Sequence, residues 1–397
     1  MNVFKSINSI WILSIIIILT GNFCSQNLSE QQILERLPQN LHTQITAAIE
    51  KSGENKKELL SAITDCPDDQ IGSLGFLLSN MPERDLRELN KEFLLTNNSL
   101  AHKVLDSVQW AENIPHDIFL NYILPYVNLH ERRDNWREDF YNRFLPLVKD
   151  IPTPGEAAVK LNNEIWDIIN VKYSTKRAKA DQSPYESMES GLASCTGLSI
   201  ILIDACRAVG IPARFVGVPL WADHSGNHSW VEIWDNGWHY IGAGEPGPLD
   251  KTWFGERAEH SNDSEWKYSI YAASFKKTNV IFPPLFDTTA TYVYADIVTD
   301  RYSKQVRDDG LVSLAIRLFE YKNGPRIAGS VTISEDGKLI DEGSTRDETY
   351  DYNDFLIFKI QPKRSYQIRI EVGGQIKEEL FTTDDKKYQF YEVYFKE

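Results

Sequence analysis

The stretch GLASCTGLSIILIDACRAVGIPAR, residues 191–214, decides how this chain folds around its chemistry. Apolar residues recur in it at the spacing of a helix, and Gly210 supplies a stop. We therefore predict a helix over residues 196–209, with Cys195 at its amino terminus. Unpaired backbone N–H groups and the positive end of the helix dipole favour a thiolate there, and the thiolate is the nucleophilic form of cysteine.

A strand downstream offers a base. Residues 228–234, HSWVEIW, alternate strictly, and Asp-Asn-Gly at 235–237 is a strong hairpin signal. If Asn236 and Gly237 alone form the loop, the ladder brings His228 opposite Glu245. A bulge or a three-residue loop would shift every pair. The two-residue loop predicts that a base and a carboxylate meet across two strands.

Thiol-dependent acyl transfer needs a thiolate, an imidazole within hydrogen-bond reach, a group that holds the imidazole and donors for the oxyanion. Cys195, His228 and Glu245 occur in that order, with the cysteine on a helix and the histidine on a strand. We expect them to act as nucleophile, base and orienting carboxylate. Taken singly, Cys195 could be an inert buried cysteine at a helix start, and His228 could be an inert surface histidine on a strand.

The quoted block, followed by GNHSWVEIWDNGWHYIGAGEP at 226–246, resembles the core of the transglutaminase-like superfamily. The resemblance spans residues 155–260. In particular, the chain resembles secreted bacterial members that add an N-terminal helical region and a C-terminal β-sandwich, and its core is also similar to that of peptide N-glycanases. It implies a papain-like α+β core in which Cys195 is the nucleophile and His228 the base.

The chain departs from the family pattern at the third catalytic residue. The family usually places an aspartate four positions after the hairpin tryptophan, and Gly242 stands four positions after Trp238. No aspartate follows until Asp250. Glu245 is the nearest carboxylate, and the peptide N-glycanases carry a glutamate at the corresponding later place. This resemblance also assigns Glu245 the orienting role.

The fold class expected is multidomain α+β. After residues 1–25, helical patterns separated by prolines fill residues 26–150, the transglutaminase-like core occupies 151–285, and turn-separated strands fill 286–397. The strand-rich part predicts an antiparallel, Ig-like β-sandwich. Because it lacks histidine and cysteine, we expect adhesion, orientation or packing there and no chemistry.

The first residues indicate export. Lys5 precedes the apolar run 10–19. This is the layout of a signal peptide, and the run is shorter than a typical membrane-spanning helix. Cleavage near Ser25 is expected, and a lipoprotein through Cys24 is the less favoured alternative because Phe23 occupies the place of a small residue. The predicted location is therefore secreted, periplasmic or at the cell surface.

The amino-acid composition limits the classes of partner and cofactor that we expect this chain to bind. A net charge of −15 disfavours nucleic acid and anionic membranes. The remaining cysteines, Cys66, Cys195 and Cys206, are too few for a disulfide framework. The spacing of His224, His239 and His260 fits no tight ligand cluster, so we expect no metal, and the chemistry requires no nucleotide or organic cofactor.

Further side chains are candidates for supporting the site. Trp166 or Gln182 could supply an oxyanion donor beside the backbone N–H of Cys195. Glu232 lies two residues along the His228 face, and Trp230 shares that face. Hairpin and core packing is the plainer interpretation of Trp230.

The sequence therefore predicts a secreted, cysteine-dependent amide-processing enzyme that forms an acyl-enzyme on Cys195. The substrate would be a glutamine carboxamide or a peptide or glycopeptide amide, presented by a protein, a peptide or a cell-surface polymer. Protease, transglutaminase and glycopeptide amidase remain open, with hydrolysis slightly preferred because water needs no second binding site. The alternative is a catalytically inactive transglutaminase-like scaffold that binds cell-surface protein or polysaccharide.

Overall fold

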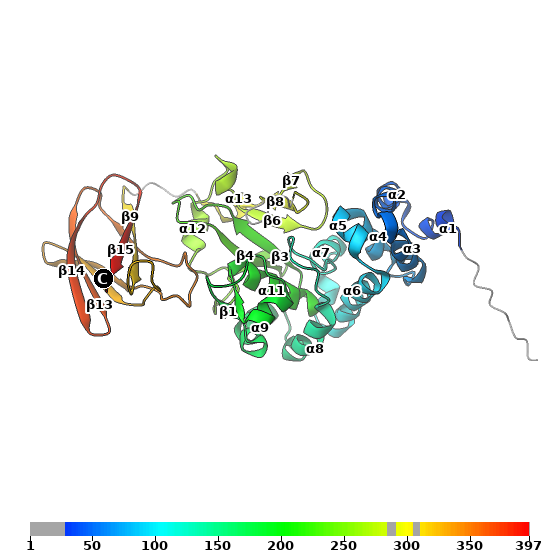
Figure 1. Cartoon of the computed structure of the whole chain (residues 1–397), viewed down its shortest axis with the longest axis horizontal. Helices are drawn as coiled ribbons and strands as arrows, with labels where there is room; N and C mark the ends of the chain where they lie inside the picture. Colours follow the sequence, from blue (N-terminus) through cyan, green and yellow to red (C-terminus); the bar gives the residue numbers. More distant parts are fainter. Residues whose placement is uncertain (1–27, 284–290, 305–309, 397) are drawn as a thin grey trace, which may run out of the picture.

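The computed structural model describes residues 28–283, 291–304 and 310–396. The predicted signal peptide and Cys24 lie outside the described residues. Figure 1 shows an elongated molecule with a helical region at one end, a mixed core in the middle and strands at the other end. Within the described ranges no helix is long and apolar enough to cross a membrane.

The N-terminal region consists of short amphipathic helices, as the sequence pattern predicts. Their apolar faces share one buried cluster that includes Ile45, Leu59, Leu74 and Leu94. The helices are α1 (Glu30–Leu34), α2 (His42–Lys51), α3 (Lys56–Asp65), α4 (Ile71–Asn80), α5 (Glu83–Glu88), α6 (Lys91–Lys103), α7 (His116–Tyr122) and α8 (Arg137–Val148). Helix α8 differs, because its apolar face joins the cluster of the central core instead.

The central core places helices against an antiparallel sheet whose strand order is β5-β4-β3-β6-β8-β7. Its strands are β3 (Ala213–Val218), β4 (His228–Trp234), β5 (Trp238–Ile241), β6 (Tyr271–Ser274), β7 (Val280–Ile281) and β8 (Tyr294–Ile297). Its helices are α9 (Pro154–Ile169), α10 (Pro184–Ser190), α11 (Cys195–Ala208), α12 (Gly255–Glu259) and α13 (Thr299–Tyr302). A short parallel pair, β1 (Lys172–Tyr173) and β2 (Leu192–Ala193), leads into α11. Strand β8 shows that the core sheet continues past residue 285.

Helix α11 is the central element of the core. Every one of its residues after Cys195 is buried, so the helix is enclosed on all sides and not on one face only. Each large aliphatic side chain buried in this way contributes about 1.5–3 kcal/mol. The helix ends before Gly210, whose φ of 77° suits glycine, and a Cβ there would press on Val104 and Val108. Tight packing of this helix fixes where Cys195 lies.

The C-terminal region forms two small sheets, ordered β11-β10-β13-β14 and β12-β9-β15. Inward side chains from both sheets share one apolar cluster, to which Leu314, Ile333, Phe358 and Ile368 belong. The strands are β9 (Val312–Phe319), β10 (Ser330–Glu335), β11 (Lys338–Ser344), β12 (Leu356–Ile360), β13 (Ser365–Val372), β14 (Gln375–Thr382) and β15 (Tyr388–Tyr394). The pairing is antiparallel, as the sequence predicts, except between β9 and β15, which run parallel.

Candidate active site

Cys195 is the first residue of α11 and the half-buried member of an otherwise buried helix. The hydroxyl of Ser194 caps the helix by accepting from the N–H of Gly197 at 3.2 Å and donating to the carbonyl of Ala180 at 2.6 Å. One residue later, the Thr196 hydroxyl lies 3.2 Å from that of Ser229. This contact ties the start of the cysteine helix to the histidine strand.

His228 is the first residue of β4 and pairs with Val218 of β3. Its ring is only 1% exposed, and the nearest aromatic ring centroids, those of Phe254 and Trp253, lie 4.7 and 4.8 Å away. Burial lowers the pKa of His228 to about 4, since a charged imidazolium loses its hydration there. His228 is therefore neutral at physiological pH and able to accept a proton.

The carboxylate nearest to this pair comes from the C-terminal region. An Oδ atom of Asp351 lies 3.6 Å from Nδ1 of His228. One ligand-type atom from each of Cys195, His228 and Asp351 lies within 4.8 Å of the other two. A helix start, a strand start and a loop between β11 and β12 thus bring a thiol, an imidazole and a carboxylate together.

Asp351 is held in place by an unusual loop anchor. Arg326 is 5% exposed, and its guanidinium donates to the backbone carbonyls of residues 347, 350, 351, 352 and 354 at 2.8–3.3 Å. The loop also binds the core, because the N–H of Tyr352 donates to the Tyr173 hydroxyl and the Asn353 amide donates to the carbonyl of Asn227. The position of Asp351 is therefore fixed from both domains.

The sequence predicts that the helix start favours a thiolate, but the surroundings of Cys195 in the structure favour the neutral thiol. Burial raises its pKa and the negative charge of Asp351 raises it further, while the backbone N–H groups of Ser229 and Thr196 act in the opposite direction. With the imidazole also neutral, the pair is not a preformed thiolate–imidazolium ion pair. The geometry suits a base that takes the thiol proton during attack, with Asp351 stabilising the imidazolium that results.

A cleft opens beside the thiol. It has a volume of about 520 Å³, and both domains contribute to its walls. Its lining includes Tyr173, Arg177, Ser194, Cys195, Asp351 and Tyr352. A substrate carbonyl can therefore reach the sulfur from solvent, next to the loop that carries Asp351.

Glu245 does not lie where the predicted hairpin ladder puts it. Trp234 pairs with Trp238, which makes Asp235, Asn236 and Gly237 a three-residue connection, so the predicted register is wrong by one residue. Strand β5 ends at Ile241, before Glu245 is reached. The left-handed backbone of Asn236, with φ of 57°, accommodates the longer turn.

Glu245 instead holds a tryptophan that packs on the histidine. Its carboxylate accepts from Nε1 of Trp253 at 2.6 Å, and the Trp253 ring contacts the His228 ring. Within the described residues neither ring nitrogen of His228 has a hydrogen-bond partner, and neither does Oε2 of Glu245. Burial raises the pKa of Glu245 to about 8.

Position 242 explains how Glu245 fits in this turn. A Cβ built on Gly242 would come within 2.0 Å of Oε2 of Glu245. The Glu245 carboxylate thus fills the space that a side chain at 242 would enter. Asn162 of α9 holds the turn, because its amide donates to the carbonyls of Gly242 and Glu245 and accepts from the N–H of Gly244.

The other candidate residues have hydrogen bonds that fix the fold. Trp166 donates to the carbonyl of Asn162 in its own helix, and the Gln182 amide donates to Glu186, Ser190 and Leu192. Trp230 donates to the Tyr302 hydroxyl, and Glu232 is buried against Arg214 and Arg301 at 2.7 Å each. As oxyanion or supporting groups these four residues stay predictions.

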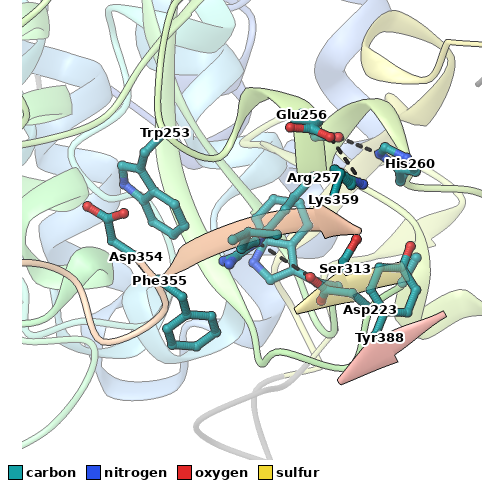
Figure 2. Close-up of a pocket in the computed structure, with 13 residues that line it drawn as sticks. Asp223, Trp253, Glu256, Arg257, His260, Ser313, Asp354, Phe355, Lys359 and Tyr388 are labelled. Carbon is teal, nitrogen blue, oxygen red and sulfur yellow. Dashed lines mark hydrogen bonds and ion pairs between the residues drawn. The ribbon is translucent and has the colours of Figure 1, made fainter. Parts of the chain in front are cut away.

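A second pocket, of about 250 Å³, follows the seam between the core and the C-terminal region. Figure 2 shows Trp253 beside Asp354 and Phe355, which follow Asp351 in the chain. On the opposite side Lys359 and His260 face Glu256. Because Trp253 also contacts His228, this seam lies directly behind the candidate active site.

Asp351 is the residue that sequence reasoning missed. The expectation that the C-terminal region carries no chemistry rested on its lack of histidine and cysteine, and a carboxylate needs neither. The signal available was TRDETYDYND at 345–354, an acidic run that interrupts the alternation of the strands. Such a run is ordinarily a solvated loop, so it did not distinguish Asp351 from its neighbours.

Comparison with known proteins agrees with the core assignment. Residues 145–243 match the family model described as the transglutaminase-like superfamily, so the chain contains a transglutaminase-like core. This match includes Cys195 and His228 and ends before Glu245 and Asp351. No curated protein matches the chain.

Two solved structures are similar over parts of the chain. One, a candidate cysteine protease from Cytophaga hutchinsonii, has 17% identity and a TM-score of 0.28, covering 36% of this chain and 48% of that one. The other is red sea bream transglutaminase, with 8% identity and a TM-score of 0.27, covering 72% of this chain and 58% of that one. The chain thus spans about half the length of these structures.

Proposed function

We propose that this protein is a cysteine-dependent enzyme that cleaves or transfers an amide acyl group. The observation that carries the proposal is the meeting of Cys195, His228 and Asp351 at the start of a buried helix, beside an open cleft. The matched transglutaminase-like core supports it. We also retain export as part of the proposal, on the strength of the N-terminal sequence alone.

The proposed reaction has two stages. As the sulfur of Cys195 bonds to the substrate carbonyl carbon, His228 takes the thiol proton, and Asp351 stabilises the imidazolium. His228 then returns that proton to the leaving nitrogen as the carbon–nitrogen bond breaks, which leaves a thioester. Water, or a second amine, attacks the thioester and regenerates the thiol. Backbone N–H groups near the helix start are the available oxyanion donors.

Trapping the thioester tests this proposal. The full chain is mixed with a panel of glutamine-containing peptides, quenched in acid and analysed by mass spectrometry, with Cys195→Ala as control. We expect an adduct on Cys195 whose mass shows whether ammonia or a peptide fragment left. Added methylamine should divert the acyl group if the enzyme is a transferase.

Iodoacetamide labelling provides the second arm. Cys66 and Cys206 are buried, at 2% and 0% exposure, so protein that lacks residues 1–25, and with them Cys24, should be labelled at Cys195. If the wild type and Cys195→Ala label equally and no adduct forms, the enzyme proposal fails and the inactive-scaffold interpretation replaces it.

A further inference from the structure

We propose that Cys195, His228 and Asp351 together bind one zinc ion, and that its binding reversibly stops the thiol chemistry. The three side chains offer sulfur, nitrogen and oxygen, which are the donor atoms that zinc takes in proteins. The inhibitory half of this inference rests on the proposed function. The binding half does not, because it concerns the ligand set alone.

The separations fit a tetrahedral ion. Zinc bonds of about 2.0–2.3 Å place neighbouring ligand atoms about 3.3–3.8 Å apart. Nδ1 of His228 and the carboxylate of Asp351 are already 3.6 Å apart, and all three ligand atoms lie within 4.8 Å of one another. Closing the widest separation needs a shift of about 1.0–1.5 Å at most, which side-chain rotation can supply.

The imidazole provides a second, independent observation. His228 is 1% exposed, yet neither of its ring nitrogens has a hydrogen-bond partner among the described residues. A buried polar atom without a partner destabilises the folded state, and a metal bond would satisfy one of these nitrogens. Imidazole nitrogen is also the commonest metal ligand among protein side chains.

Charge and access are consistent with the ion. A thiolate and a carboxylate balance the two positive charges of zinc, and the proton of the Cys195 thiol leaves to solvent as the sulfur–zinc bond forms. Cys195 and Asp351 both line the 520 Å³ cleft, so the ion has an entry path and water can take the fourth position. With its sulfur bound to zinc, Cys195 cannot attack a carbonyl.

Cobalt(II) as a substitute probe tests the ligand set on the full chain. We expect one cobalt per chain, with a sulfur-to-cobalt charge-transfer band and the intense visible bands of a tetrahedral ion. Cys195→Ala should abolish the charge-transfer band. A band that survives in Cys195→Ala would come from Cys24, Cys66 or Cys206 and would overturn the proposal.

Zinc affinity, measured by competition with a chromophoric chelator, tests the carboxylate. Asp351→Asn should weaken binding at least about tenfold, the lower end of what loss of a supporting residue costs a metal site. The matched control is Asp354→Asn in the same loop, which loses an ion pair with Arg346 and should bind zinc as the wild type does. Equal affinities in both variants would refute the assignment of Asp351. Cys195→Ser, which preserves the size of the side chain, guards against a folding artefact.

Iodoacetamide labelling tests whether zinc binding blocks the reactivity of the Cys195 thiol. Zinc chloride should suppress labelling of Cys195, and a chelator should restore it. Labelling that proceeds unchanged under saturating zinc overturns the metal proposal and leaves the enzyme proposal intact. If the protein still binds zinc at these residues but forms no acyl adduct, the enzyme proposal fails and the metal proposal stands.

Discussion

Replacing Glu245 by glutamine should stabilise the protein at alkaline pH and leave it unchanged in mild acid. Burial raises the pKa of Glu245 from its usual 4.5 to about 8 in the folded chain. Between those two pH values the folded state holds a proton that the unfolded state has lost. The associated stability is therefore complete below about pH 4.5 and is lost as the pH rises through about 8.

The magnitude follows from that interval. Each pH unit within it changes the free energy of unfolding by about 1.4 kcal/mol, so the full effect is roughly 3–5 kcal/mol. Glutamine has the shape of the protonated acid and carries no charge at any pH. We expect Glu245→Gln and the wild type to have equal free energies of unfolding near pH 4.5. Near pH 9 the free energy of unfolding of the variant should exceed that of the wild type by roughly 3–5 kcal/mol.

Urea denaturation followed by tryptophan fluorescence measures this difference. No tryptophan follows Trp266 in the sequence, so the signal reports on the helical region and core and not on the C-terminal strands. Glu189→Gln is the matched control, because the Glu189 side chain is 70% exposed. Parallel stability curves for Glu245→Gln and the wild type would refute the reasoning. The same variant also tests catalysis, since a large loss of acylation in it, absent from Asp351→Asn, would return the orienting role to Glu245.

The remaining predictions concern the site and its supports. His228→Ala should slow acylation of Cys195 by about 10²–10⁴-fold, the usual contribution of a general base, in a stopped-flow assay with an activated ester; an unchanged rate would remove His228 from the mechanism. Arg326→Met should lower the free energy of unfolding by at least about 2 kcal/mol, because loop carbonyls lose a charged donor, and should expose the Asp351 loop to limited proteolysis; an intact loop would contradict its anchoring role. Gly242→Ala should destabilise the core by about 1–3 kcal/mol through its clash with Glu245. Adding Glu245→Ala should relieve that cost in a double-mutant cycle, whereas additive effects would count against the clash.

The cysteine helix and the histidine strand could be predicted from sequence because each depends on a local pattern. The apolar spacing after Cys195 and the alternation after His228 are visible within a few turns of chain, and the helix is found at Cys195–Ala208. The family resemblance to the core draws on the same local blocks. Local periodicity thus predicts the helix and the strand, and in the structure one ligand-type atom of Cys195 lies within 4.8 Å of one of His228.

The carboxylate beside Cys195 and His228, that of Asp351, could not be predicted because no local sequence pattern specifies it. The hairpin register depended on whether Asp235 belongs to the strand or to the turn, and that one residue separates the predicted ladder from the observed one. The placement of Asp351 depends on how Arg326 shapes a loop and how that loop meets Asn227 of another domain. Contacts of this kind arise only when the domains dock.

The origin of Asp351 in the last domain has a consequence for biosynthesis. Domains generally fold as units, with N-terminal domains first, so the core with Cys195 and His228 can form before the strands after residue 310 have emerged. Under the proposed mechanism, a nascent chain at that stage lacks the carboxylate that stabilises the imidazolium. Full activity would then begin only after translation has reached the C-terminal strands, and a prematurely terminated product would be a weak enzyme.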